Sequence, residues 1–356
     1  MCEYKRLRRW TLACGVRIVY GRRTTHGPES LNGQPMPHVS RRAELTRAGL
    51  MVAAALAISG AAAAQATTPP PVLGRWDLIV TGPAGPYPSW LEVTSSGFNA
   101  LVGRWVGRVG SARPIARLEF ANGAFRFAIP RQWEEGEGDL RVEGKLDSDR
   151  LSGSVTTPDG HSHPFTATRA PSLRRATAPA WGTPVALFNG TDLTGWTTQR
   201  GGENHWRVVN GVLANTASGA NLMTTRTFSD FKLHLEFRYP RGGNSGVYLR
   251  GRHEVQIEDN AEKEWPASVH IGGVYGFLVP NENAATGPDQ WQTYDITLIG
   301  RRVTVVLNGR TVIADQTIPG PTGGAIDSNE GAPGPILLQG DHTAVEFRNI
   351  RITPAK

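Results

Sequence analysis

Polar side chains that could take part in acid–base chemistry are concentrated in one stretch of the C-terminal half. Alternate side chains of an extended strand point to the same face of a sheet. In the segment His253–Asp259 this rule places Glu254 and Gln256 on one face, while Val255 and Ile257 point to the other. A row of carboxyl and amide groups suits the hydroxyl groups of a carbohydrate, although such a row can also simply face solvent. We expect this strand to be the centre of a site that handles a sugar.

A second group of polar residues occurs in short glycine-flanked runs near this strand or further along the chain. It supplies an imidazole, an amide, a phenol and guanidinium groups, which together with the carboxyl group of Glu254 make a plausible catalytic set. These residues are Arg250, Tyr275, Gln339, His342 and Arg348.

The carboxyl groups of the strand do not match those of an ordinary retaining glycosidase. Such enzymes place two carboxyl groups about 5–5.5 Å apart across the scissile bond. Glu254 and Glu258 are about 13 Å apart at ~3.3 Å per residue. Gln256, an amide, lies between them, and Asp259 falls on the opposite face of a regular strand. We therefore expect a different way of breaking the glycosidic bond.

The histidines are scattered, and none forms a pair at the spacing expected of metal ligands. His161 and His163 could share one face of a strand, but Pro164 follows them and we expect a loop there. The sequence thus identifies no cofactor with certainty and leaves a divalent metal ion open.

The N-terminal part of the chain has the composition of an export signal. An apolar, alanine-rich run from Ala48 to Ala64 follows three arginines, and residues 64–66 have the small-x-small pattern that signal peptidase cleaves. We expect residues 1–66 to be an over-long leader with a signal peptide that is cut near Ala66. The mature protein is then expected to be periplasmic or secreted, with no membrane span.

The charge balance argues against a nucleic-acid partner. The full chain has 38 Lys and Arg against 31 Asp and Glu, a formal net charge of +7. Ten of these cations and three of the anions lie in residues 1–66, which leaves 28 of each in the remainder. Without a basic excess there is no electrostatic basis for binding a phosphate backbone. A small carbohydrate is the expected partner, and the sequence does not define the oligomeric state.

Both cysteines, Cys2 and Cys14, lie in the predicted leader. The expected mature chain therefore has neither a disulfide nor a thiol nucleophile. Its stability must come from burial of a core, and the remaining length predicts two domains.

The first predicted domain comprises residues 74–169. Short runs of alternating apolar and polar residues, separated by glycine-rich turns, predict about eight strands in a small β-meander or barrel-like domain. Its tryptophans could line a ligand cup or fill a core, and we expect a core for Trp76, Trp90, Trp105 and Trp133.

A second domain is predicted for residues 184–354, after a linker of residues 170–183 that is rich in proline and alanine. Alternating strands return here, and the Asn308-Gly309 pair predicts a type I′ hairpin turn because both residues accept positive φ. We expect an all-β protein whose second domain is a two-sheet sandwich or jelly roll.

Several short motifs in the second domain occur in the order seen in one known family. Residues 184–353 resemble the 3-keto-disaccharide hydrolase domain, formerly a domain of unknown function. The resemblance rests on Leu187-Phe188-Asn189-Gly190, Leu193-Thr194-Gly195-Trp196, Trp206-Arg207-Val208, Asn244-Ser245-Gly246, Glu254-Val255-Gln256 with Asp259, Tyr275-Gly276, Trp291-Gln292, Leu307-Asn308-Gly309, Leu338-Gln339, Asp341-His342 and Phe347-Arg348-Asn349-Ile350.

This resemblance implies a concanavalin A-like jelly roll that acts on glycosides already oxidised to a ketone at C3. A C3 ketone acidifies the hydrogen on C2, so that a base can remove it, the enolate can expel the oxygen from C1, and water can add back. Under this scheme Glu254 or His342 is the base, while Arg250, Arg348 or a metal ion stabilises the enolate. The expected substrate contacts are Asn244, Gln256, Asp259, Tyr275, Gln339 and Arg348.

Two alternatives stay open at this stage. The enzyme could act as a hydrolase or as a lyase, depending on whether water adds to the eliminated sugar. A non-catalytic, lectin-like protein could instead use the same face for carbohydrate binding.

Overall fold

The computed structural model describes residues 69–356 except 176 and 200. The described residues form strands, turns and loops without a helix, which confirms the all-β prediction. In this part of the chain there is accordingly no helix of the length and apolarity that crossing a membrane requires. The predicted leader and signal peptide, residues 1–66, lie outside the described residues.

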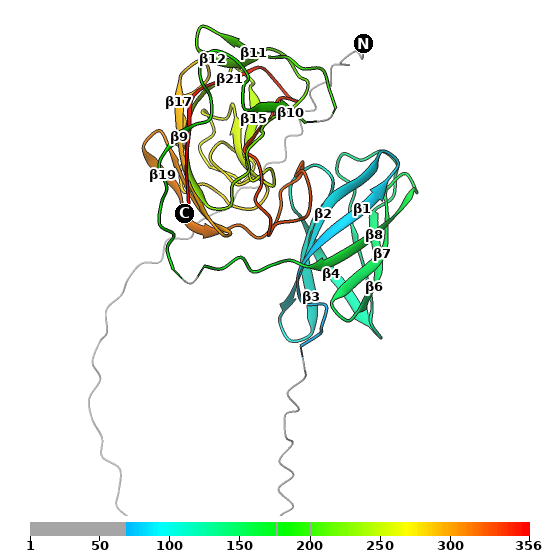
Figure 1. Ribbon diagram of the computed structural model, residues 1–356. Coiled ribbons are helices and arrows are strands. Elements are labelled where there is room, and N and C mark those ends of the chain that lie inside the picture. The colour runs from blue at the N-terminus through cyan, green and yellow to red at the C-terminus, as the bar shows by residue number, and fades with distance from the viewer. Residues whose placement is uncertain (1–68, 176, 200) are drawn as a thin grey trace, which may run out of the picture. The chain divides into compact units, whose positions relative to one another are not determined.

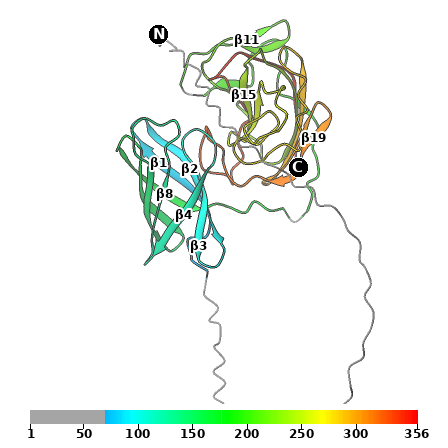
Figure 2. The same cartoon turned by 180° about the vertical axis from the view of Figure 1, so that it is seen from behind.

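Eight antiparallel strands in the N-terminal half close into a barrel (Figures 1 and 2). Each strand pairs with the next one along the chain, and β1 also pairs with β8, with Leu78 opposite Ala167. The prediction of a barrel-like domain is thus confirmed. The strands are β1 (Gly74–Gly82), β2 (Gly85–Ser96), β3 (Ala100–Val106), β4 (Arg113–Ala121), β5 (Ala124–Ile129), β6 (Leu140–Asp147), β7 (Arg150–Thr156) and β8 (Ser162–Arg169).

Inward-pointing apolar side chains fill the barrel, as expected for a small closed barrel. Phe125 and Phe127 of β5 are buried there together with Trp76 and Trp105. Trp133 lies in the loop between β5 and β6 and is 59% exposed, so the prediction that it belongs to the core is wrong.

The prediction of a loop around His161 and His163 is also wrong. Strand β8 begins at Ser162 and includes both His163 and Pro164. At Pro164 the strand pairs with β7, whereas its pairing with β1 begins only at Phe165. A proline fits this position because one edge of the strand is still free of a partner.

The C-terminal half contains two antiparallel sheets. One has five strands in the order β10-β13-β20-β15-β16, and the other has the order β11-β12-β21-β14-β17-β18-β19, with β9 paired to β21. Their bounds are β9 (Val185–Ala186), β10 (Trp196–Thr198), β11 (Trp206–Val209), β12 (Val212–Asn215), β13 (Leu222–Thr224), β14 (Phe231–Arg238), β15 (Asn244–Leu249), β16 (His253–Glu258), β17 (Gln292–Ile299), β18 (Arg302–Leu307), β19 (Arg310–Thr317), β20 (Leu337–Leu338) and β21 (Val345–Pro354).

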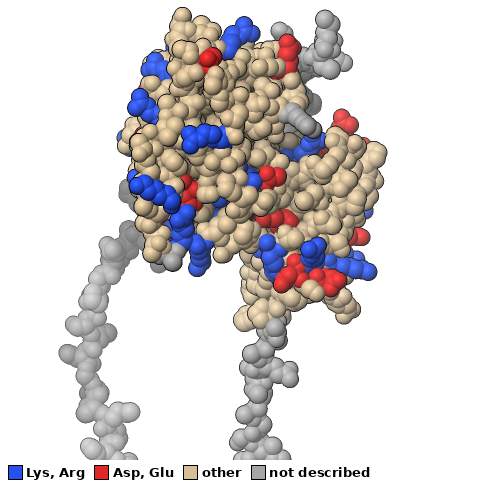
Figure 3. Space-filling view, in the orientation of Figure 1, with Lys and Arg blue, Asp and Glu red and all other residues tan. Residues whose placement is uncertain are grey.

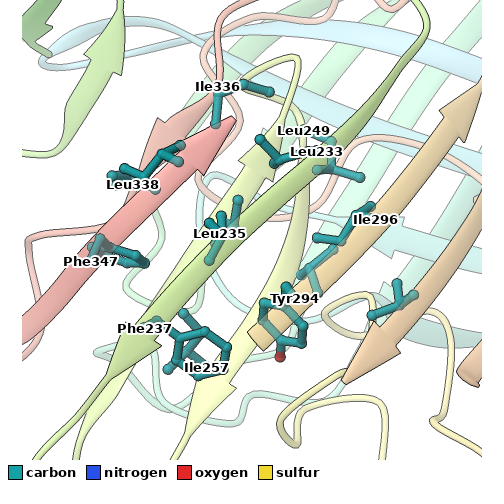
Figure 4. Close-up of a cluster of buried hydrophobic side chains, with 14 of the residues drawn as sticks. Leu233, Leu235, Phe237, Leu249, Ile257, Tyr294, Ile296, Ile336, Leu338 and Phe347 are labelled. Atoms are coloured by element: carbon teal, nitrogen blue, oxygen red, sulfur yellow. The ribbon is translucent and has the colours of Figure 1, made fainter. Parts of the chain in front are cut away.

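One hydrophobic core lies between these two sheets (Figure 4). Leu233, Leu235 and Phe237 alternate along β14 and are all buried, and they face Leu249 of β15 and Ile257 of β16. Because the inner side of β16 is committed to this core, its other side is left for polar groups. The core thus fixes which face of β16 can carry a site.

Two hairpin turns rely on residues with positive φ. Asn308 and Gly309, between β18 and β19, have φ of 50° and 77°, as the predicted type I′ turn requires. The turn between β15 and β16 likewise contains Arg250 and Gly251 at φ of 53° and 66°. This second hairpin sets the register in which Tyr248 lies opposite Glu254 and Gly246 opposite Gln256.

Charged side chains of both signs lie intermixed on the face of the molecule in Figure 3. This distribution agrees with the equal numbers of cationic and anionic residues in the chain after residue 66.

Candidate active site

A cavity of about 110 Å³ opens on the polar side of β15 and β16. Six of the residues singled out from the sequence line it, together with Tyr248 and parts of four loops. These six are Asn244, Glu254, Gln256, Tyr275, Gln339 and His342. The fold therefore brings the predicted carboxyl and amide groups of the β15–β16 hairpin together with the phenol of Tyr275 and the imidazole of His342.

Glu254 of β16 lines the cavity and is only 3% exposed. Burial raises the pKa of its carboxyl group from 4.5 to about 8, although a hydrogen bond from Tyr248 and the nearby His342 oppose the shift. The carboxyl group packs over Gly246, where an added Cβ would lie 2.2 Å from Oε1 of Glu254. Glycine at 246 thus makes the space in which a buried acid can sit.

Tyr248 connects Glu254 to the opposite wall of the cavity. Its hydroxyl oxygen is 2.9 Å from Oε2 of Glu254 and 3.0 Å from the carbonyl oxygen of Gly323. A phenol has one proton, and the carbonyl can only accept it. The two oxygens therefore compete for this one proton; donation to Oε2 of Glu254 favours the ionised carboxyl group, while burial, the larger effect, favours the protonated one.

His342 is paired with its neighbour Asp341, with 2.6 Å between Nδ1 and the carboxylate oxygen Oδ1. This hydrogen bond and the negative charge of Asp341 raise the pKa of the imidazole above 6.5, while partial burial opposes the change. A carboxylate at Nδ1 fixes the proton on that nitrogen, so Nε2 is left to accept a proton. His342 is half exposed, unlike the buried Glu254.

Two buried amide oxygens in the cavity wall, Oε1 of Gln256 and Oε1 of Gln339, have no hydrogen-bond partner among the described residues. Buried polar atoms are normally satisfied, so these two mark places where a ligand or water donates a hydrogen bond. Burial also raises the pKa of Tyr275, as do the charges of Glu254 and Glu258, and its hydroxyl group keeps its proton. The wall thus offers acceptors and a donor of the kind that sugar hydroxyls need.

Three predicted site residues do not reach the cavity. Arg250 is buried at the hairpin turn, where Nη2 donates to the carbonyl oxygen of Gly300 over 2.7 Å. Asp259 accepts a hydrogen bond from the backbone N–H of Gly242 over 2.7 Å and so holds a loop.

Arg348 belongs to β21 of the other sheet. Its Nε donates to Glu236 over 2.6 Å, and its guanidinium group lies 3.9 Å from the ring centroid of Trp291. The expectation that Arg250 or Arg348 stabilises an enolate, and that Asp259 and Arg348 contact substrate, is therefore corrected. Sequence proximity to the polar strand did not reveal which sheet or face each side chain occupies.

Some residues of the cavity were missing from the predicted site. Tyr248 could have been found, because it alternates with Asn244 and Gly246 on the same face of β15. Asp341 was visible only as the neighbour of His342. Val109 and Gly110, from the loop between β3 and β4, also line the cavity, and no local pattern in the sequence indicates this.

A metal site was left open by the sequence. In residues 69–356 as described, no three His, Cys, Asp or Glu side chains are grouped closely enough to hold an ion.

Residues 183–353 match the family model described as the 3-keto-alpha-glucoside-1,2-lyase-like domain, which confirms the resemblance expected from the sequence. The match supports a carbohydrate-active function.

Several solved structures are similar to part of the chain. The chain is 28% identical to a candidate glycosyl hydrolase from Parabacteroides distasonis ATCC 8503, covering 50% of this chain and 92% of that one at a TM-score of 0.42. A second candidate glycosyl hydrolase of the same organism is 25% identical, covering 48% of this chain and 98% of that one at a TM-score of 0.38. A carbohydrate-binding module from Bacillus subtilis is 16% identical, with coverage of 44% and 94% and a TM-score of 0.31. A comparison with curated proteins gives no match.

Proposed function

We propose that this protein cleaves the glycosidic bond of 3-keto-glycosides, including 3-keto-disaccharides, by removing the C2 proton and eliminating the group on C1. One observation carries the proposal. A single cavity of about 110 Å³ combines a buried carboxyl group that stays protonated at neutral pH with an imidazole oriented by a carboxylate. An elimination needs one group of each kind.

The ketone at C3 makes this reaction accessible to ordinary side chains. It acidifies the C2–H bond, so the electron pair of that bond can move into an enolate when a base takes the proton. The enolate then forms the C1–C2 double bond and breaks the bond from C1 to the glycosidic oxygen. The leaving oxygen takes a proton from an acid, which yields a free alcohol and an unsaturated keto-sugar. Addition of water at C1 completes a net hydrolysis.

The two pKa shifts support one assignment of the acid and base roles. A general acid has to hold its proton at the working pH, and Glu254, with a pKa of about 8, does so at neutral pH. A general base has to be available without its proton. The hydrogen bond with Asp341 raises the pKa of His342 from its usual 6.5 and holds Nδ1, so that Nε2 is the atom that accepts a proton once the imidazole is neutral. We therefore infer that Nε2 of His342 removes the C2 proton and that Glu254 protonates the leaving oxygen.

Four other residues of the cavity would bind and orient the sugar. The unpartnered amide oxygens of Gln256 and Gln339 accept hydrogen bonds from ring hydroxyls. Asn244 adds an amide at the edge of the cavity, and the protonated hydroxyl of Tyr275 can donate to the oxygen on C3 as negative charge develops there. Asp341 acts through His342, because it holds the imidazole in the useful tautomer.

The first test compares a 3-keto-disaccharide with its unoxidised parent. We expect release of the leaving sugar from the keto compound alone, because the parent has no acidic C2–H. Binding of both compounds without turnover of either would instead identify a lectin-like protein and refute the proposal. Repeating the assay with a chelator tests the metal-free account, which predicts unchanged turnover.

A second test separates the acid from the base. We expect Glu254→Gln to lose activity on a 3-keto-disaccharide, whose leaving alcohol needs a proton. The same variant should recover activity on a 3-keto-glucoside of 4-nitrophenol, because that leaving group departs without protonation. His342→Ala should lose activity on both substrates, since each needs C2 deprotonation. If His342→Ala recovered activity on the 4-nitrophenyl substrate and Glu254→Gln did not, His342 would be the acid and Glu254 the base.

A further inference from the structure

The barrel contributes directly to the cavity of the sandwich. Barrel and sandwich belong to the same compact unit of the chain. Val109 and Gly110, in the loop between β3 and β4, line the cavity together with Glu254 and His342. These two loop residues lie outside the segment that matches the family, residues 183–353. The site of this chain thus has a wall that the family domain does not supply.

This loop is seated firmly against the sandwich. The backbone N–H of Gly324 donates to the carbonyl oxygen of Arg108 over 3.0 Å. The backbones are so close that a Cβ on Gly323 would lie 2.3 Å from the carbonyl oxygen of Gly110. Gly323 also accepts the hydrogen bond from Tyr248, the partner of Glu254. The loop is therefore in contact with the same residues that hold the proposed acid.

The size of the cavity limits what can enter. Its volume of about 110 Å³ is well below the roughly 300–1,000 Å³ of pockets that enclose drug-sized ligands. One sugar ring is the most that it can take. The second ring of a disaccharide must then lie outside the cavity, against whatever surface borders its mouth.

An exposed tryptophan lies beside this border. The indole Nε1 of Trp133 is 3.4 Å from the position that a Cβ on Gly110 would occupy. Trp133 is 59% exposed, which is unusual for a residue whose ring is so costly to leave in water. Amphipathic aromatic rings of this kind stack on the apolar faces of flat ring ligands.

The backbone of Trp133 is held in place by polar contacts within the barrel. Its N–H donates to Oε2 of Glu134 over 3.3 Å, and Glu134 forms an ion pair of 2.7 Å with the buried Arg113, the first residue of β4. These contacts tie the backbone of Trp133 to the start of β4, which directly follows the loop of Val109 and Gly110. A backbone that is already held in place has little conformational entropy to lose when the ring binds a ligand.

We propose that the barrel forms the subsite for the leaving-group sugar, with the indole of Trp133 as its stacking platform and the loop of Val109 and Gly110 as the wall between the two sugar positions. This inference rests on the proposed function, because it takes the ring inside the cavity to be the keto-sugar. It adds a specificity for disaccharides over glycosides of small alcohols and gives the barrel a role in substrate binding.

The experiment compares a 3-keto-disaccharide with the methyl 3-keto-glycoside of the same sugar, on the full chain and its Trp133→Ala variant. We expect KM for the disaccharide to rise about tenfold or more, as is usual when an aromatic anchor is removed, with kcat nearly unchanged. The methyl glycoside has no second ring, so its KM should stay the same. Trp133→Phe keeps a ring and should recover most of the loss.

Phe98→Ala is the matched control. Phe98 is an exposed aromatic residue of the same barrel, in the turn between β2 and β3, at the other end of β3 from the cavity loop. It should change neither KM. The subsite would be overturned if Trp133→Ala and Phe98→Ala changed KM for the disaccharide equally. It would also be overturned if Trp133→Ala changed KM equally for the disaccharide and the methyl glycoside. A wild-type chain that turns over neither substrate would overturn the proposed function and the subsite with it, so the two failures are distinguishable.

Discussion

Glu254→Gln should make the folded protein more resistant to alkaline pH than the wild type. The pKa of the Glu254 carboxyl group rises from 4.5 to about 8 in the folded state, because burial disfavours its charge. The folded state therefore binds this proton more tightly than the unfolded state does. The free energy of unfolding contributed by this group is highest below pH 4.5 and falls as the pH rises towards 8.

The magnitude follows from the difference between the two pKa values. Each unit of difference corresponds to about 1.4 kcal/mol, so ionisation of Glu254 costs the folded state on the order of 5 kcal/mol above pH 8. Glutamine has nearly the same shape and does not titrate. The variant should lose none of this free energy as the pH rises.

Urea unfolding from about pH 4 to about pH 9 measures the effect. The stability of Glu254→Gln relative to the wild type should increase by up to about 5 kcal/mol across the window from pH 4.5 to 8 and stay constant above it. Glu135→Gln, a change at an exposed carboxyl group, serves as the control and should follow the wild type. If the free energy of unfolding changed with pH in the same way for all three proteins, Glu254 would titrate normally. This result would contradict its proposed role as the general acid.

Three further predictions concern the catalytic groups. The rate should rise with pH as His342 loses its proton above pH 6.5 and should fall as Glu254 loses its proton near pH 8, which a pH profile of kcat/KM measures; a profile without a descending limb would contradict the acid role. Asp341→Asn should move the ascending limb to lower pH and lower the maximum by about tenfold or more, because the charge that raises the pKa of His342 is gone; an unmoved limb would show that Asp341 does not act on the imidazole. Gly246→Ala should destabilise the protein by about 1–3 kcal/mol in urea unfolding and displace Glu254, since the added Cβ would lie 2.2 Å from its Oε1; wild-type stability and activity would contradict the packing described here.

The sequence predicts the strand pattern well because alternation is a local property. Residues of β14 alternate between buried and more exposed positions as a pleated strand requires, and in β16 the same alternation puts Glu254 and Val255 on opposite faces although both are buried. The barrel was recognisable for the same reason, although its closure by β1 and β8 depends on residues far apart in the chain.

The site was less predictable because it depends on long-range placement. Arg348 has the right chemistry but belongs to the other sheet, and only the pairing of β21 with β14 decides this. Gly110 and Glu254 are separated by more than half of the described chain, and no periodicity connects a barrel loop to a sandwich strand. The exposure of Trp133 is a further case, because loop conformation and not composition leaves its ring in solvent.

The most direct test of the central claim follows the hydrogen on C2. A 3-keto-disaccharide deuterated at C2 is turned over in ordinary water, and the product is analysed at early times against an enzyme-free control. Elimination by His342 predicts slower turnover than with the undeuterated substrate and loss of deuterium from every product molecule. Full-rate turnover with deuterium retained at C2 would mean direct displacement at C1 and would contradict the account.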